Sequence, residues 1–232
     1  MKKHIPNMIT CCNLISGCIA TVFALNGDAG MALLWIVIGA VFDFFDGMSA
    51  RLLGVSSPIG KELDSLADDV TFGVAPSAIV FSFLKVNCGV DTALSPLHSV
   101  LPYVAFVMAA FSALRLAKFN LDERQTTSFI GLPTPANALF WGALIVGLGD
   151  MLASSPYGLY GVIAMIFVSS YLLVAELPLF ALKFKHWGWK DNEVKYIFLL
   201  TSAAMILLMG IIGIAAVIAW YVILSVATRK KQ

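Results

Sequence analysis

Long apolar segments separated by short polar stretches run through the chain, and they predict membrane-spanning helices. About 20 apolar residues are enough for a helix to cross the hydrocarbon core of a bilayer. With boundaries good to a few residues, the segments are 6–25, 31–53, 61–84, 98–119, 134–152, 157–182 and 195–228. We therefore expect an all-α fold, a polytopic transmembrane helical bundle. Pro76 is expected to kink the third span.

The positions of the basic residues predict the topology. Fourteen of the 15 Lys and Arg residues fall on alternate connections, and Lys85 alone lies on the other side. The positive-inside rule then places both termini in the cytoplasm, which requires an even number of spans. We therefore divide the last tract near Gly210 into two short helices of about 15–18 residues each, at the lower limit for spanning. This gives eight spans, with seven as the alternative.

Composition supports an integral membrane protein and gives no sign of a nucleic-acid partner. The chain is 59% hydrophobic and 12% charged, with a mean hydropathy of +0.88 and a net charge of +1. No connection is long enough to separate domains, so residues 1–232 are expected to form one membrane domain.

Polar or helix-disrupting residues interrupt the first segment, namely Pro6, Asn7, Thr10 and Asn13. This pattern favours a retained helix over a cleaved signal peptide.

Acidic residues are concentrated where the chain is otherwise apolar. Six of the 14 lie within residues 43–69, namely Asp43, Asp46, Glu62, Asp64, Asp68 and Asp69. Ionisable groups at membrane depth are costly and usually mark a functional site. Only Arg51 and Lys61 are basic in this window, so ion pairing does not account for the cluster. Several carboxylates together favour a bound divalent cation.

Helical spacing brings four of these acids to matching positions. Asp43 and Asp46 share one face of the second span with Gly47 and Ala50, and Asp64 and Asp68 share one face of the third with Gly60. At 1.5 Å per residue, Asp43 and Asp68 lie roughly 12 Å from the connecting loop. Asp46 and Asp64 lie about 6–8 Å from it. Carboxylate oxygens suit hard cations such as Mg²⁺, Mn²⁺ or Ca²⁺. Glu62 and Asp69 point away from the shared face.

The complete pattern resembles the signature of the CDP-alcohol phosphotransferases, with all eight signature positions at that family's spacing. The residues are Asp43-x2-Asp46-Gly47-x2-Ala50-Arg51-x8-Gly60-x3-Asp64-x3-Asp68. The resemblance implies a core of six helices, here about residues 5–182, with additional C-terminal helices at about 195–228. It also implies a CDP-linked lipid donor, one or two divalent cations and a homodimer.

The resemblance also assigns roles to single residues. It implies that Asp43, Asp46 and Asp64 hold metal, and that Asp68 lies near the metal and acts as the general base. The nucleotide-binding residues that it implies are Gly47, Ala50 and Arg51, with Gly60 at the mouth of the site and Asn7 and Thr10 approaching from the first helix.

Four further segments resemble the membrane-type phosphatidylserine synthases within this family. They are 60–68, 72–76, 115–120 and 129–135. This resemblance implies transfer of a phosphatidyl group from CDP-diacylglycerol to L-serine with release of CMP. From the topology given by the basic residues, we expect the site at the cytoplasmic face of the cell (inner) membrane.

The residues alone leave more than one acceptor alcohol open. Arg115 and Lys118 share one face of the fourth span at its cytoplasmic end and are candidates to bind the serine carboxylate or a phosphate. Membrane anchoring is the alternative role for both, and Arg124 is a weaker candidate. Glycerol 3-phosphate and an inositol phosphate remain alternative acceptors. A cation transporter is a more distant alternative, because it leaves Gly47 and Arg51 unexplained.

Overall fold

A computed structural model describes residues 4–55, 57–88, 99–121, 129–180, 188–189 and 192–228. Its long helices are α1 (His4–Leu25), α2 (Ala29–Leu53), α5 (Val107–Leu121), α6 (Thr134–Ser154), α7 (Gly158–Val174), α8 (Glu193–Met209) and α9 (Ile211–Thr228). The third helix is composite, with α3 (Pro58–Asp68), a π-helical segment η1 (Asp69–Val74) and α4 (Ala75–Asn87). A 3-10 segment, η3 (Leu101–Phe106), leads into α5.

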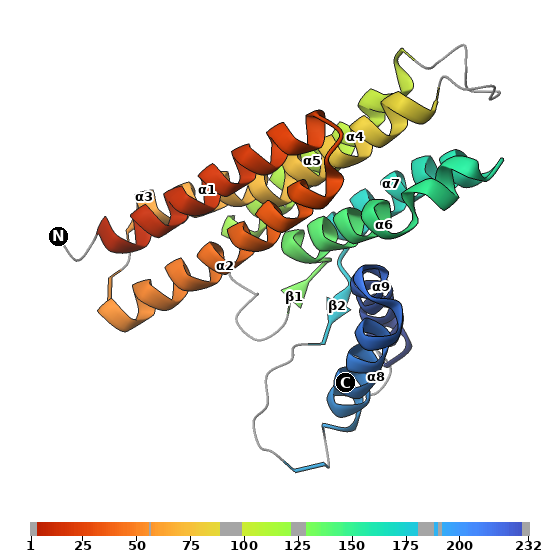
Figure 1. Ribbon diagram of the computed structural model, residues 1–232. Helices are drawn as coiled ribbons and strands as arrows, with labels where there is room; N and C mark the ends of the chain where they lie inside the picture. The colour runs from red at the N-terminus through yellow and green to blue at the C-terminus, as the bar shows by residue number, and fades with distance from the viewer. Residues whose placement is uncertain are drawn as a thin grey trace.

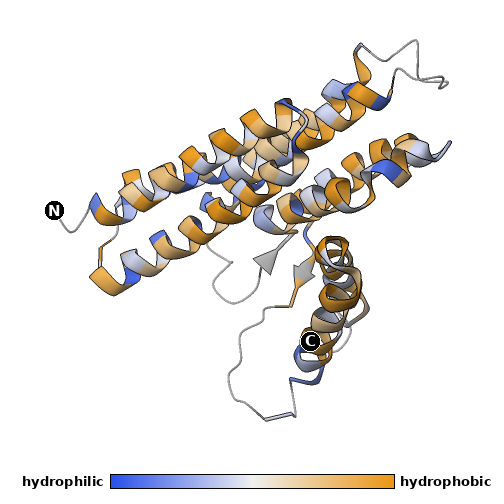
Figure 2. Cartoon of the chain, in the orientation of Figure 1, coloured by the Kyte–Doolittle hydropathy of each residue, from blue (hydrophilic) through white to orange (hydrophobic). Residues whose placement is uncertain are grey.

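These helices confirm the all-α, polytopic architecture. Six are long and apolar enough to cross a membrane: His4–Leu25, Ala29–Leu53, Pro58–Asn87, Leu101–Leu121, Thr134–Ser154 and Ile211–Thr228. Hydrophobic residues predominate along these helices, as Figure 2 shows, and many of their apolar side chains, such as Leu52 and Leu121, are largely exposed. A surface of this kind suits lipid better than water. The chain is an integral membrane protein.

The last apolar tract is divided at the predicted position. Helix α8 ends at Met209 and α9 begins at Ile211, with Gly210 between them at a φ of 59°. Such a positive φ is readily adopted only by glycine. The two helices fold back on each other and extend away from the rest of the bundle (Figure 1). Helix α9 packs against α6, where Ile212 lies close to Gly147.

The sixth segment is shorter than the sequence predicted. The expected span 157–182 ends as a helix at Val174, and Ala175 has an extended backbone. Two-residue strands then pair antiparallel, β1 (Phe129–Ile130) with β2 (Pro178–Leu179). Gly131, at a φ of 78°, donates its N–H to the carbonyl of Leu177, and Leu132 donates its N–H to the carbonyl of Leu172, so the segment before α6 is bonded to the end of α7 and to the residues after it. The pairing was not predicted, because two residues carry too little of the alternating pattern that identifies a strand.

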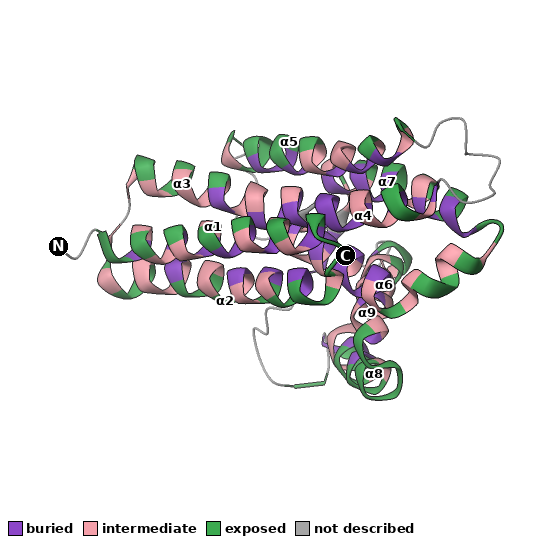
Figure 3. Ribbon diagram, turned by 45° about the horizontal axis from the view of Figure 1, so that its top comes forward, coloured by how far each residue is buried: buried purple, intermediate pink, exposed green. Residues whose placement is uncertain are grey.

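The third helix passes through the interior of the bundle. Its η1 segment packs against α1, α2, α5 and α6, and Phe72 is completely buried there. Buried positions cluster around this helix, whereas α8 is largely exposed (Figure 3). A kink was expected at Pro76, and just before it the structure has the π-helical segment, where Ala75 donates its N–H to the carbonyl of Val70, five residues back. Proline lacks an N–H and disrupts regular α-helical bonding, which accounts for a wider turn here.

Candidate active site

Three of the four aspartates of the signature meet between α2 and α3. Each of Asp43, Asp64 and Asp68 offers a carboxylate oxygen, and these oxygens lie within 4.8 Å of one another. Helix α1 packs against both α2 and α3, while α2 and α3 make little backbone contact with each other. The two faces predicted from the sequence therefore approach each other through their carboxylates, and α1 packs beside both helices.

Asp46 lies on the same face of α2, beside this group. Its side chain is 6% exposed, and its Oδ2 atom has no hydrogen-bond partner among the described residues. It interacts electrostatically with both Asp43 and Asp64. The four acids singled out in the sequence thus belong to one site, with carboxylate oxygens of three within 4.8 Å of one another and Asp46 at the border of a cavity.

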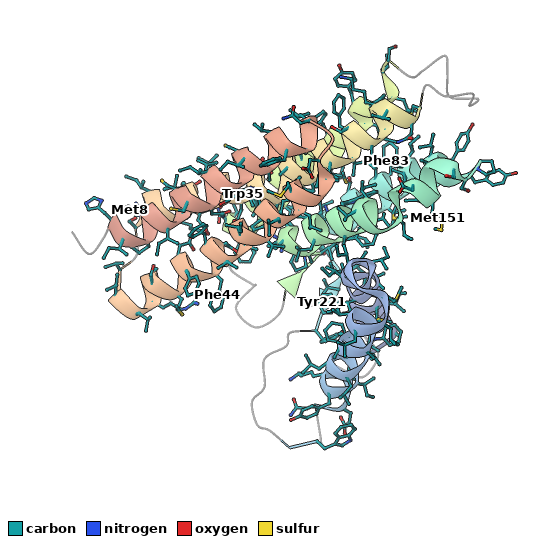
Figure 4. All side chains as sticks on the ribbon, viewed as in Figure 1. Met8, Trp35, Phe44, Phe83, Met151 and Tyr221 are labelled. Carbon is teal, nitrogen blue, oxygen red and sulfur yellow. The ribbon has the colours of Figure 1, made fainter. Side chains whose placement is uncertain are left out.

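The cavity opens at the end of the bundle where α1 and α3 begin and α2 ends. Its volume is about 280 Å³. The lining residues are Pro6, Asn7, Thr10, Asp46, Gly47, Ala50, Val55, Ser57, Gly60, Lys61 and Asp64. Met8 and Phe44, labelled in Figure 4, mark the parts of α1 and α2 that flank the site. The acidic group and the cavity are therefore continuous through Asp46 and Asp64.

Five of the six residues predicted to bind the CDP-linked lipid line this cavity: Asn7, Thr10, Gly47, Ala50 and Gly60. Small residues on α2 keep it open, because a side chain longer than that of Ala50 would project into it. Arg51 is exposed beside the cavity, and its Nη1 atom would lie 3.6 Å from a Cβ atom placed on Gly47. The structure thus brings the predicted nucleotide residues together from three helices.

Local structure explains how α3 enters the site. The Ser57 hydroxyl accepts a hydrogen bond of 3.0 Å from the N–H of Gly60, which caps the helix, and Pro58 occupies its first turn. A Cβ atom on Gly60 would lie 3.1 Å from Asn7 Oδ1, so glycine permits the close approach of α1 and α3. The cap and the glycine together fix the direction from which Asp64 and Asp68 reach the acidic group.

Lys61 lines the cavity although the sequence did not identify it as a site residue. Its Nζ donates a hydrogen bond of 2.9 Å to the carbonyl of Asn120 at the end of α5. The Asn120 amide in turn donates to Ser65 Oγ at 2.8 Å. The only signal in the sequence is its place beside Gly60, which does not distinguish a cavity residue from a membrane anchor.

The two candidate acceptor residues on α5 have different surroundings. Arg115 is 8% exposed, and its Nε atom has no hydrogen-bond partner among the described residues. It interacts electrostatically with Asp68. Lys118 is exposed. Arg115 is thus the member of this pair that faces the acidic group, and Arg124 lies outside the described residues.

The two acids expected to be bystanders also differ. Glu62 is exposed on α3. Asp69 is partly buried in η1 and faces α5, where Gly73 leaves room for both the Asp69 carboxylate and Ser112. Neither residue belongs to the group of carboxylates that meet between α2 and α3.

The donor set fits a divalent cation. Three carboxylates at this spacing repel one another, and Asp64 Oδ1 is buried without a hydrogen-bond partner among the described residues. A hard cation that binds oxygen ligands would offset the repulsion and provide a partner for Asp64 Oδ1. Next to a cation, the cavity can hold a negatively charged group such as a diphosphate, which the carboxylates alone would repel.

Comparison with known proteins agrees with this geometry. The profile of the CDP-alcohol phosphatidyltransferase family matches residues 3–226. The CDP-diacylglycerol–serine O-phosphatidyltransferase of Helicobacter pylori is 31% identical over 228 residues, covering 93% of this chain and 90% of that protein. The Bacillus subtilis enzyme of the same name is 41% identical over 133 residues, covering 57% of this chain and 70% of its own length. The Saccharomyces cerevisiae enzyme of that name is 37% identical over 175 residues, covering 68% of this chain and 59% of that protein. This chain belongs to the CDP-alcohol phosphatidyltransferase family.

Proposed function

We propose that this protein transfers the phosphatidyl group of CDP-diacylglycerol to the hydroxyl of L-serine, forming phosphatidylserine and releasing CMP. One observation carries the proposal: a cavity lined by the predicted nucleotide residues runs directly into a group of three carboxylates. The names of the relatives support CDP-diacylglycerol as donor and serine as acceptor.

The cation in this proposal is Mg²⁺ or Mn²⁺, with one or two ions per site, and Ca²⁺ also suits the oxygen ligands. Asp43, Asp64 and Asp68 would hold it, with Asp46 beside them at the cavity. A bound divalent cation neutralises the diphosphate and the charge that grows on the departing phosphate. The nucleotide would lie against Gly47 and Ala50, where the backbone of α2 is accessible.

Asp68 acts as the general base in this mechanism. As the serine hydroxyl oxygen attacks the lipid-side phosphorus, its proton passes to the Asp68 carboxylate. The new bond joins the serine oxygen to phosphorus, and the bond between that phosphorus and the CMP oxygen breaks. CMP leaves with the electron pair of the broken bond. Substitution of this type depends mainly on positioning and charge compensation, which the acidic group and the cavity provide.

Arg115 is the side chain that we assign to the acceptor, with Lys118 contributing from the exposed side of α5. A guanidinium pairs with a carboxylate or phosphate through two parallel hydrogen bonds. Arg115 is buried and interacts with Asp68, so an anion bound to it would lie near the base. The same arrangement would accept glycerol 3-phosphate or an inositol phosphate, which makes the acceptor the first point to test.

We further propose the placement of the protein in the cell. Val55 and Ser57, from the connection between α2 and α3, line the cavity, and the distribution of basic residues assigns this connection to the cytoplasm together with both termini. The substrates then reach the site from the cytoplasm and from the inner leaflet of the cell membrane. Residues 1–232 function as a single catalytic domain, and the assembly is a homodimer, which the mass of the detergent-solubilised protein tests.

Release of CMP by the purified protein tests the activity. The protein would be given CDP-diacylglycerol and Mn²⁺ or Mg²⁺ together with L-serine, glycerol 3-phosphate or inositol 1-phosphate in separate reactions. We expect CMP release with serine only. Release with one of the other acceptors would replace serine in the proposal, and no release with any acceptor would refute the enzymatic function.

A further inference from the structure

Asn13 of α1 holds the aspartate to which we assign the proton transfer. Its amide Nδ2 donates a hydrogen bond of 3.0 Å to Asp68 Oδ1. The Asn13 side chain is completely buried, so water does not compete for this contact. We propose that Asn13 is a positioning residue, which fixes the Asp68 carboxylate in the orientation required for metal binding and for catalysis. Its effect on turnover rests on the proposed function, whereas its effect on metal binding does not.

Asn13 is itself held in place by two other helices. Thr71 of η1 donates its hydroxyl to the main-chain carbonyl of Asn13 at 3.0 Å, which holds this turn of α1 against the third helix. On α2, a Cβ atom placed on Gly39 would lie 3.0 Å from Asn13 Oδ1 and 2.5 Å from Thr71 Cγ2. The amide therefore sits where α1, α2 and the third helix come closest, and it has little room to turn. A donor fixed by three helices can fix its acceptor in the same way.

An amide is chemically suited to this task. A carboxylate has two oxygens, and a donor on Oδ1 leaves both lone pairs of Oδ2 for other ligands. A lysine or arginine at this position would add a positive charge and compete with a cation for the same carboxylate. Asn13 orients Asp68 without adding charge. Residues that orient metal ligands through such hydrogen bonds commonly contribute about 10–100-fold to metal affinity or activity.

The competing explanation is that Asn13 only joins two helices. In that case its loss would weaken the fold without a specific effect at the acidic group. Ser16 provides the matched control, because it lies one turn further along the same face of α1 and is equally buried. Its hydroxyl donates to the Cys12 carbonyl of its own helix, so it has no bond to Asp68 to lose.

The test compares Asn13→Ala, Asn13→Ser and Ser16→Ala with the wild type, each as the purified full chain. In Asn13→Ser the short hydroxyl is expected to bond within α1, as Ser16 does, which retains a polar group but removes the donor to Asp68. Mn²⁺ affinity, followed by electron paramagnetic resonance, should fall about 10–100-fold in both Asn13 variants. At saturating Mn²⁺, kcat for CMP release should fall by about 100-fold while KM for CDP-diacylglycerol changes little. Ser16→Ala should match the wild type in all three quantities.

Two results would overturn the inference. One is an Asn13→Ala protein with wild-type Mn²⁺ affinity and kcat. The other is an equal loss in Ser16→Ala, which would show a general effect of altering buried polar groups on α1. If the wild type binds Mn²⁺ but releases no CMP with any acceptor, the proposed function fails, and the comparison of Mn²⁺ affinities still decides the role of Asn13.

Discussion

A variant that lacks one carboxylate of the acidic group should be more stable than the wild type when no metal is present. When metal is bound, the same variant should be less stable than the wild type. Asp43, Asp64 and Asp68 offer oxygens within 4.8 Å of one another. At that distance, two unit charges in an effective dielectric of about 20 repel by roughly 3.5 kcal/mol. Asp64→Asn removes two of the three pairwise repulsions, about 7 kcal/mol at full charge. Even one fifth of this sum, about 1.4 kcal/mol, raises Tm by about 3–6 °C for a chain of this size.

A bound cation should make the wild type more stable than Asp64→Asn. A metal present at 100 times its Kd stabilises the folded state by about 2.7 kcal/mol, provided that it does not bind the unfolded chain. The wild type should gain this stability, and Asp64→Asn should lose most of it together with CMP release. The assay is thermal unfolding of the detergent-solubilised protein in EDTA and in saturating Mn²⁺.

Glu62→Gln is the matched control for this experiment, because Glu62 is an exposed acid two positions from Asp64 on the same helix. Its Tm should follow the wild type in both conditions. The reasoning would be refuted by a wild-type Tm that Mn²⁺ leaves unchanged, or by an Asp64→Asn protein that is less stable than the wild type in EDTA.

Four further substitutions test the other parts of the site. At saturating Mn²⁺, Asp68→Asn should abolish CMP release with limited loss of nucleotide binding, and a normal rate would remove Asp68 as the base. Ala50→Leu should fill part of the cavity and raise KM for CDP-diacylglycerol by about tenfold or more, since overpacking costs about 1–3 kcal/mol; unchanged KM would place the nucleotide elsewhere. Arg115→Met should raise KM for serine by roughly 10–100-fold, as expected for a lost hydrogen bond to a charged group, and exposed Lys118→Met should have a smaller effect. Equal effects of these two on serine KM would contradict the placement of the acceptor at Arg115.

The sequence was sufficient to predict the helices and the two faces that meet. The 3.6-residue period places Asp43 and Asp46 on one face and Asp64 and Asp68 on another, and the structure has these faces opposite each other. The break at Gly210 was also predictable, because glycine interrupts an apolar tract too long for one ordinary span.

Contacts between helices could not be predicted in the same way. The hydrogen bond from Asn13 to Asp68 joins residues 55 positions apart, and it depends on how α1 and α3 are rotated relative to each other. The π-helical segment after Asp68 depends on packing against four neighbouring helices, and Pro76 alone indicated only a kink. The early end of α7 at Val174 depends on a two-residue strand pairing with a distant segment.

Incorporation of labelled L-serine into lipid tests the central claim most directly. The purified wild-type protein would be incubated with CDP-diacylglycerol, Mn²⁺ and labelled serine, and the organic-soluble product identified by mass. We predict phosphatidylserine in an amount equal to the CMP released, and no labelled lipid when EDTA is present or when Asp68 is replaced by Asn. Wild-type protein that binds CDP-diacylglycerol and Mn²⁺ but forms no labelled lipid would contradict the account.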